Sequence, residues 1–172
     1  MPYDLSRLDV LVVEAEDSMA ATWRSLFDGL GIRNPTIVAS CATAWAALAM
    51  TTGARPDIVI CRWELPGAED AMSGLDLVRR LRGDPASPSP FLPVIIATAT
   101  ITRERVREAL DAGVHEVLVL PLSAKALETR LRETIDRPRK FVRGGGYFGP
   151  DRRRFTRPDY PGPYRRNEEK VG

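Results

Sequence analysis

The chain has 172 residues, 44% of them hydrophobic and 28% charged, which suits one domain of ordinary size with an appendage and excludes a wholly disordered or fibrous protein. Its longest apolar runs fall far short of the roughly 18 residues that cross a bilayer. The opening residues, Met-Pro-Tyr-Asp, lack the basic and apolar regions of a secretory signal, so we expect a cytoplasmic protein with no membrane span.

The net charge of +2 is unevenly distributed along the chain. Residues 1–136 carry 14 Lys and Arg against 19 Asp and Glu, a net of −5, whereas residues 137–172 carry 11 against 4, a net of +7. The second segment also holds 6 of the 13 Gly and 5 of the 14 Pro, which argues against a continuous helix or a central strand there. We therefore predict a domain over residues 1–136 and a basic Gly/Pro/Arg-rich extension over residues 137–172.

The first segment alternates short apolar runs with amphipathic stretches. The runs are typical of strands buried on both faces, and they cover residues 9–14, 36–39, 57–61, 93–97 and 116–120. Between and after them, apolar residues at helical spacing predict helices. The first helix begins after Asp17 or Ser18, either of which can cap it, and the others cover residues 42–51, 73–82, 102–112 and 124–135.

Five strand-helix units predict a parallel sheet, because parallel neighbours need crossover connections and these are right-handed. The expected fold class is α/β, a doubly wound five-stranded parallel sheet with helices on both faces. Ligands of such sheets bind at the carboxyl ends of the strands, beside the switch point. The site is therefore expected near residues 14–17 and 62–66.

Residues 8–136 resemble the receiver domain of two-component response regulators, the CheY-like fold. The resemblance depends on the order and spacing of several short motifs rather than on any one of them. They lie at residues 10–14, 56–61, 64–66, 73–75, 93–96, 109–113 and 120–121. The resemblance implies a flavodoxin-like strand order of 2-1-3-4-5.

The resemblance also implies a phosphorylation pocket, and this chain departs from it. Receivers phosphorylate an aspartate that ends the third strand, with Mg²⁺ held by that aspartate and two acids, and with a hydroxyl and a lysine on the phosphoryl oxygens. The corresponding residues here are Glu14 and Ala15 for the acids, Arg62 for the acceptor, Thr98 for the hydroxyl and Leu120 for the lysine.

Arg62 cannot accept a phosphoryl group by this route or ligate Mg²⁺, because its guanidinium stays protonated. The resemblance therefore indicates a pseudo-receiver, non-enzymatic and with no required cofactor or metal. We expect Arg62 to pair with Glu14 or Glu16 and so to hold the fold in one state without phosphate. The alternative is a conventional phosphorelay regulator that uses a non-standard acceptor, for which Glu64 is the nearest candidate.

A partner surface follows from the same resemblance. It comprises the fourth helix, the fifth strand and the fifth helix, with Val117 at the aromatic switch position. Three arginines alternate along the fourth helix: Arg103, Arg105 and Arg107. They suit a signalling protein partner, although a solvated helix face would look the same. A homodimer is a further option.

The basic extension contains an internal repeat. Residues 147–153 match residues 160–166 at Tyr, Gly, Pro, Arg and Arg. Paired arginines beside an aromatic ring suit a purine-bearing anion, because Arg binds guanine through two hydrogen bonds and stacks on π faces. The candidate ligand-binding residues are Tyr147, Arg152, Arg153, Arg154, Tyr160, Arg165 and Arg166.

A receiver without its acceptor, joined to an Arg-rich extension, resembles the CheY-like cyclic-di-GMP effectors. This implies that the extension binds the dinucleotide and that the receiver contacts a partner such as the flagellar motor. Three alternatives stay open for the extension: it binds nucleic acid, it docks on protein including its own receiver, or it only aids solubility.

The remaining polar and aromatic residues have structural interpretations. His115 has no second ligand or nucleophile near it in sequence, and Trp23 and Trp45 lie at helical spacings typical of core residues. Cys41 and Cys61 are expected to be reduced structural thiols.

Overall fold

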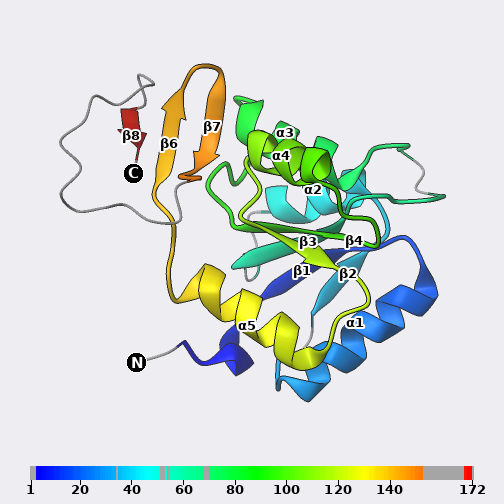
Figure 1. The fold of residues 1–172 in the computed structure, drawn as a ribbon. Coiled ribbons are helices and arrows are strands. Elements are labelled where there is room, and N and C mark those ends of the chain that lie inside the picture. The colour runs from blue at the N-terminus through cyan, green and yellow to red at the C-terminus, as the bar shows by residue number, and fades with distance from the viewer. Residues whose placement is uncertain are drawn as a thin grey trace.

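A five-stranded parallel sheet forms the centre of the molecule (Figure 1). The computed structural model describes residues 3–33, 35–50, 53, 55–67, 70–152 and a short strand at 169–171. The sheet strands are β1 (Val10–Val13), β2 (Thr36–Val38), β3 (Ile58–Arg62), β4 (Val94–Thr98) and β5 (Glu116–Val119). Their order is β2-β1-β3-β4-β5 with every neighbouring pair parallel, which confirms the predicted fold class and strand order.

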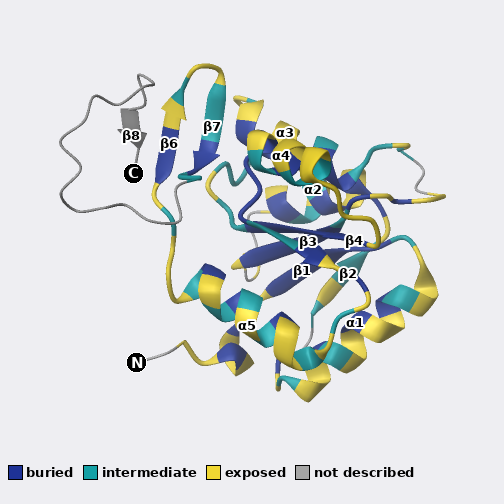
Figure 2. Ribbon diagram, in the orientation of Figure 1, coloured by how far each residue is buried: buried dark blue, intermediate teal, exposed yellow. Residues whose placement is uncertain are grey.

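Helices cover both faces of this sheet (Figure 1). One face carries α1 (Asp17–Gly29) and α5 (Ala124–Ile135), and the other carries α2 (Cys41–Ala49), α3 (Gly74–Gly83) and α4 (Arg103–Ala112). Each face has its own apolar cluster, so every residue of β1 and β4 is buried. Figure 2 shows the resulting buried layer between the helices.

Side-chain caps fix four of the helix starts. Ser40 and Ser73 form capping boxes, and the hydroxyls of Thr102 and Ser123 accept from the backbone three residues ahead. The prediction that Asp17 or Ser18 caps α1 is wrong. The helix begins one residue earlier, with Glu16 at the N-cap and no side-chain capping bond.

The aromatic residues of the helices differ in burial. Trp23 and Phe27 are fully buried and stack with ring centroids 5.9 Å apart. Trp45, which was also expected in the core, is half-buried, and the Arg80 guanidinium lies 4.0 Å from its ring centroid. Both cysteines are buried and free, as expected. No helix in the described part of the chain is long and apolar enough to cross a membrane.

The extension begins with a β-hairpin. Strands β6 (Phe141–Gly144) and β7 (Tyr147–Pro150) pair antiparallel, and β8 (Glu169–Val171) pairs with the other edge of β6. The prediction that this segment contains no central strand is therefore wrong. Gly145 and Gly146 form the turn between β6 and β7, with positive φ angles of 57° and 78°. The start of β6 contains no glycine, so its β-prone residues are uninterrupted.

The hairpin packs against the body at the amino ends of β4 and β5. Phe141 and Val142 are buried, and β7 contacts both α3 and α4. The backbones approach so closely that a Cβ on Gly149 would lie 2.8 Å from the Cα of Gly113. Residues 141–150 thus form part of the folded body's surface layer.

Candidate functional site

The carboxyl ends of β1, β3 and β4 bring the expected pocket residues together. Glu14 follows β1, and its side chain is fully buried. Its carboxylate accepts hydrogen bonds from the backbone N of Glu16 at 3.1 Å and from Nε1 of Trp23 at 3.4 Å. These two donors fix the carboxylate in place at the edge of the sheet.

Arg62 is the last residue of β3 and lies next to this carboxylate. Its Nη1 is 3.5 Å from Oε2 of Glu14 and 3.9 Å from Oε2 of Glu16, so the expected ion pair is present with both acids. The side chain is only 13% exposed. Among the described residues, however, its Nε has no hydrogen-bond partner. The guanidinium is therefore held by charge rather than by well-directed hydrogen bonds.

The same residues do not fit a divalent cation. Ala15, the neighbour of Glu14, offers no oxygen ligand from its side chain, and the Arg62 guanidinium lies beside the one buried carboxylate. Mg²⁺ needs several oxygen ligands at close range, and a fixed positive charge opposes it. Across the described ranges, no group of three His, Cys, Asp or Glu side chains could hold a metal ion.

Thr98 ends β4 and is fully buried. Its hydroxyl donates to the carbonyl oxygen of Thr100 at 3.0 Å and accepts from Nη1 of Arg105 at 3.2 Å. Arg105 also forms an ion pair with Glu64, and its guanidinium lies 4.3 Å from the ring centroid of Trp63. The hydroxyl at the end of β4 is thus already engaged by the protein.

The contacts of Arg105 were not predicted. The alternating pattern placed it with Arg103 and Arg107 on the partner surface, and both of those are exposed on α4. Arg105 instead turns toward the strand ends, because its position three residues after the N-cap Thr102 points it over the end of β4. Val117, on β5, is partly buried.

Leu120 follows β5 and is buried. Its side chain lines a groove of about 470 Å³ together with residues of α1 and with Arg62. No sequence pattern indicated this groove, and the helical spacing of Trp23, one of the α1 residues that line it, predicted a core residue.

The described candidate residues of the extension contact each other and α4. The Arg152 guanidinium lies 3.7 Å from the ring centroid of Tyr147, and its Nη1 is 2.6 Å from a carboxylate oxygen of Asp111. The Tyr147 hydroxyl donates to the carbonyl of Pro150 at 2.8 Å, and burial raises the pKa of this tyrosine. The other candidates, Arg153, Arg154, Tyr160, Arg165 and Arg166, lie outside the described residues.

A buried arginine that no sequence pattern indicated, Arg82, lies at the opposite end of the sheet. Arg82 donates to the carbonyls of Gly113, Pro90 and Leu92 at distances between 2.7 and 3.2 Å. Its guanidinium also lies 5.1 Å from the ring centroid of Phe141, and burial lowers its pKa to about 10. Arg82 therefore joins α3, two loops and the hairpin.

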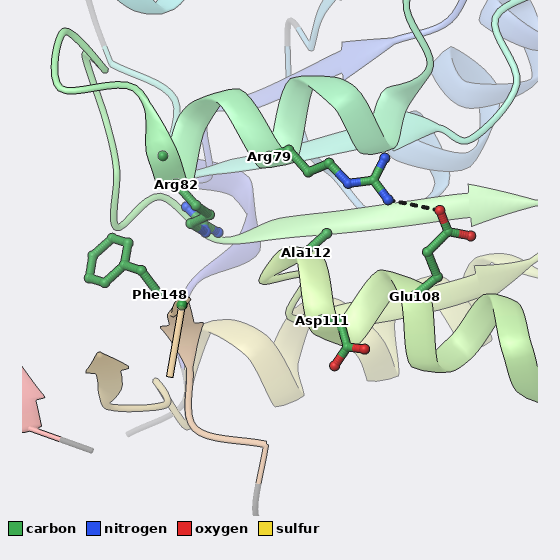
Figure 3. Close-up of a pocket in the computed structure, with 8 residues that line it drawn as sticks. Arg79, Arg82, Glu108, Asp111, Ala112 and Phe148 are labelled. Carbon is green, nitrogen blue, oxygen red and sulfur yellow. Dashed lines mark hydrogen bonds and ion pairs between the residues drawn. The ribbon is translucent and has the colours of Figure 1, made fainter. Parts of the chain in front are cut away.

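Beside Arg82, a small cleft of about 250 Å³ separates α3, α4 and the hairpin (Figure 3). An ion pair of 2.8 Å between Arg79 and Glu108 spans the two helices (Figure 3), and the Asp111 carboxylate on the cleft wall is already paired with Arg152. The charged side chains of this cleft are thus largely occupied by each other.

His115 packs beside the aromatic ring of Phe141, with the two ring centroids 5.5 Å apart. Its Nδ1 accepts a hydrogen bond from the backbone N of Val94 at 3.3 Å. Burial, with smaller contributions from the charges of Arg82 and Arg139, lowers the pKa of His115 to about 3. These contacts suit a neutral structural histidine, as the sequence indicated.

Several known proteins resemble this chain over about three quarters of its length. The model of the response regulator receiver domain matches residues 10–132, which end before the hairpin. The chemotaxis protein CheY of Pseudomonas aeruginosa is 29% identical over 130 residues, covering 76% of this chain and 98% of that protein. CheY-3 of Vibrio cholerae is 31% identical, covering 76% and 93%.

Solved structures agree on the fold. The Francisella response regulator 1452 receiver domain superimposes with a TM-score of 0.60 at 25% identity, covering 73% of this chain and 93% of that chain. The receiver domain of the sensor histidine kinase PA1611 from Pseudomonas aeruginosa, which holds a magnesium ion in its active-site cleft, gives 0.59 at 22% identity, covering 73% and 94%.

Proposed function

The chain belongs to the response regulator receiver family of two-component signalling proteins, and from this premise we propose that it is a phosphorylation-independent receiver, a non-enzymatic adaptor that contacts a signalling partner. The observation that carries the proposal is the ion pair between Arg62 and the buried Glu14 at the carboxyl end of the sheet. A guanidinium occupies the position that the family resemblance assigns to the phosphoryl acceptor.

The chemistry of the neighbouring residues supports the proposal. Arg62 offers neither a carboxylate to phosphorylate nor a lone pair for Mg²⁺. Ala15 removes a second metal ligand, and Leu120 removes the cation that would meet phosphoryl oxygens. Acceptor, metal ligand and counter-ion are therefore lost together.

The contacts of Thr98 support a single resting state. In the receivers that this chain resembles, the hydroxyl at the end of the fourth strand contacts the phosphoryl group. Here it already hydrogen-bonds with Arg105 at 3.2 Å. Since Arg105 belongs to α4, this bond fixes the start of that helix to the sheet without any phosphate.

Glu64 is the alternative residue that could accept a phosphoryl group, and its contacts argue against that role. Its carboxylate forms an ion pair with Arg105 and lies beyond the end of β3. A carboxylate paired with a guanidinium is a poor nucleophile for phosphoryl transfer, because the ion pair engages its oxygen lone pairs, and the described residues around it offer no cluster of metal ligands.

The experiment is incubation of the protein with acetyl phosphate and Mg²⁺, followed by intact-mass measurement. We expect no added phosphate, and no change in the protein's spectra with a beryllofluoride mimic. Arg62→Asp alone should also stay unlabelled, since Ala15 leaves the metal a carboxylate short. The matched positive control combines Arg62→Asp with Ala15→Asp and Leu120→Lys. A phosphate mapped to Glu64 or to any β3 residue of the wild-type chain would refute the proposal.

For the extension we propose binding of a guanine second messenger, cyclic-di-GMP. The support is the repeat of Tyr, Gly, Pro and paired Arg at a spacing of 13 residues and the match between guanidinium geometry and guanine O6 and N7. Since Tyr147 and Arg152 already stack on each other and Arg152 pairs with Asp111, the proposal assigns the ligand mainly to the second copy, with Tyr160, Arg165 and Arg166.

Titration of the full chain with cyclic-di-GMP and with oligonucleotides, each at two salt concentrations, tests this proposal. A guanine site predicts saturable dinucleotide binding that Arg165→Lys with Arg166→Lys abolishes, because Lys keeps the charge and loses the planar fork. The matched pair Arg152→Lys with Arg153→Lys should weaken binding less. Affinity that grows with oligonucleotide length and falls steeply with salt would instead indicate nucleic-acid binding.

A specific observation favours one second candidate for the extension, namely docking on protein. The hairpin and Arg152 already pack on the acidic body through Asp111. If neither cyclic-di-GMP nor oligonucleotides bind near physiological salt while capture of a partner protein still requires residues 137–172, docking replaces nucleotide binding as the role of this segment.

A further inference from the structure

A groove lies between α1 and the segment that follows β5. Its volume of about 470 Å³ falls within the range of small-molecule sites. The walls are formed mainly by Met19, Trp23 and Leu26 of α1 and by Leu120 and Leu122 across from them, and Arg62 and Glu16 also line the groove. The lining is therefore largely apolar, with one cation and one carboxylate.

The sequence explains the apolar walls. Met19, Trp23 and Leu26 recur at helical spacing and share one face of α1. Trp23 is fully buried beneath the groove, and its indole N–H is taken up by Glu14, so the exposed apolar lining on this side comes from Met19 and Leu26. Leu120 adds a side chain with no charge on the opposite wall. An apolar molecule would replace water along these walls favourably.

Arg62 gives the groove a chemical preference. Its side chain is 13% exposed, and among the described residues its Nε has no hydrogen-bond partner. The Glu14 carboxylate already accepts from Glu16 N and from Trp23 Nε1 and is 3.5 Å from Arg62. The guanidinium is partly buried and its ion pairs are long, at 3.5 and 3.9 Å, so an oxygen acceptor of better geometry would improve its pairing.

We propose that this groove binds a small amphipathic carboxylic acid, with its apolar body along α1 and its carboxylate on Arg62. Glu16 is the group that the carboxylate replaces. Its contact with Arg62 is 3.9 Å long and its side chain is 46% exposed, so it can turn into water at little cost. Arg62 is the only cation among the residues that line the groove in the described chain, and Glu16, the only anion among them, is exposed enough to turn away while Arg62 is not, which favours an acid over an amine.

The test uses decanoate as the probe and calorimetric titration of the full chain. Decanol, which has the same body without the charge, and acetate, which has the charge without the body, are the ligand controls. We expect saturable one-to-one binding of decanoate, weaker binding of decanol and no binding of acetate. Arg62→Gln should weaken decanoate at least about tenfold, the equivalent of about 1.4 kcal/mol, and leave decanol unchanged.

A second variant keeps the test decisive if Arg62→Gln does not fold. Thr22 lines the groove from the exposed side of α1, and Thr22→Trp should fill the groove and abolish binding. Thr129→Trp on α5 is the matched control, because Thr129 is also an exposed helical threonine whose hydroxyl donates to the carbonyl four residues before it. Circular dichroism verifies that each variant is folded.

Three results would overturn the inference. The first is no saturable binding of decanoate by the wild-type chain at millimolar concentration. The second is equal decanoate affinity in the wild type and a folded Arg62→Gln variant, which would remove the role of the charge. The third is equal affinity in Thr22→Trp and Thr129→Trp, which would place the site elsewhere. None of these results depends on whether the extension binds a nucleotide.

Discussion

The two ends of the central sheet each hold an arginine, buried at one end and partly buried at the other, and the two are held in different ways. At the amino ends of β4 and β5, Arg82 donates four hydrogen bonds to backbone carbonyls, none longer than 3.2 Å. At the carboxyl ends, Arg62 is near two carboxylates at 3.5 and 3.9 Å, and its Nε has no partner among the described residues.

The difference shows what each end of the sheet is suited to do. A guanidinium carries five N–H donors in a planar fork, so Arg82 can bind carbonyl groups from separate loops at once and acts as a structural crosslink. Arg62 balances the charge of Glu14, and its Nε donates no hydrogen bond among the described residues. We call the amino end of the sheet the closed end, because the donors of its arginine bind the protein itself. The carboxyl end is the one that can still bind a ligand.

Replacement of each arginine by methionine tests directly whether the two residues have different roles. Arg82→Met should lower the free energy of unfolding by about 4 kcal/mol, because buried carbonyls lose their only strong donor. Arg62→Met should lower it by only about 1 to 2 kcal/mol, since Glu14 keeps the hydrogen bonds from Glu16 and Trp23. Urea denaturation of both variants measures the difference, and equal losses would contradict the assigned roles.

The contribution of the hairpin to the closed end can be measured at Phe141. This ring is 7% exposed and meets Phe91, Phe148 and His115. Phe141→Ala should therefore destabilise the protein by about 3 kcal/mol. Met50→Ala is the control, because Met50 is 59% exposed and should change stability by less than about 0.5 kcal/mol. A loss at Phe141 no larger than at Met50 would show that the hairpin adds nothing to the fold.

The burial of His115 at the closed end predicts that the stability of the protein depends on pH. Its pKa is about 3 in the folded protein, whereas histidine in an unfolded chain titrates near 6.5. Between these values the unfolded state binds more protons, so stability is complete above about pH 6.5 and is lost as the pH falls toward 3, by up to about 1.4 kcal/mol per pH unit.

His115→Gln isolates this dependence, because glutamine does not titrate and its amide oxygen can accept from the backbone N of Val94. Between pH 6.5 and 5, most carboxylates stay ionised, and the wild type should lose more stability than the variant. Equal slopes for the two proteins would mean that His115 is protonated in the fold.

The smallest effect is expected at the ion pair that ties the end of the hairpin to α4. Arg152 and Asp111 are 2.6 Å apart, but the Asp111 side chain is 56% exposed. A double-mutant cycle with alanine should give a coupling of about 0.5 kcal/mol that falls at high salt. A salt-independent coupling above about 2 kcal/mol would make this pair a main anchor of the extension rather than a minor one.

The fold was predictable because its strands are uninterrupted apolar runs and its helices repeat apolar residues at a constant spacing. The pairing of Arg62 with Glu14 was predictable as well, since neighbouring parallel strands end at the same edge of the sheet. The cap of α1 was misplaced by a residue, because Glu16 starts the helix without a side-chain bond. Nothing local distinguishes such a start.

The features that could not be predicted from the sequence depend on contacts between segments that lie far apart in the chain. Arg82 resembles any arginine in the last turn of a helix, and its acceptors come from residues 8, 10 and 31 positions away. The direction of Arg105 depends on the rotation of α4 over the sheet. The hairpin was missed because the glycine and proline content was counted over the whole extension, which hid the β-prone residues before Gly144.

The hydrogen bond between Thr98 and Arg105 has a consequence for how a cell could use this protein. In a regulator whose hydroxyl contacts a phosphoryl group, the state of that hydroxyl reports the activity of a kinase. Under the proposed phosphorylation-independent function, a residue of the chain itself holds the hydroxyl at 3.2 Å, so a partner would contact the same surface in every copy. The strength of the signal would then be set by the number of copies, and therefore by synthesis and degradation of the protein.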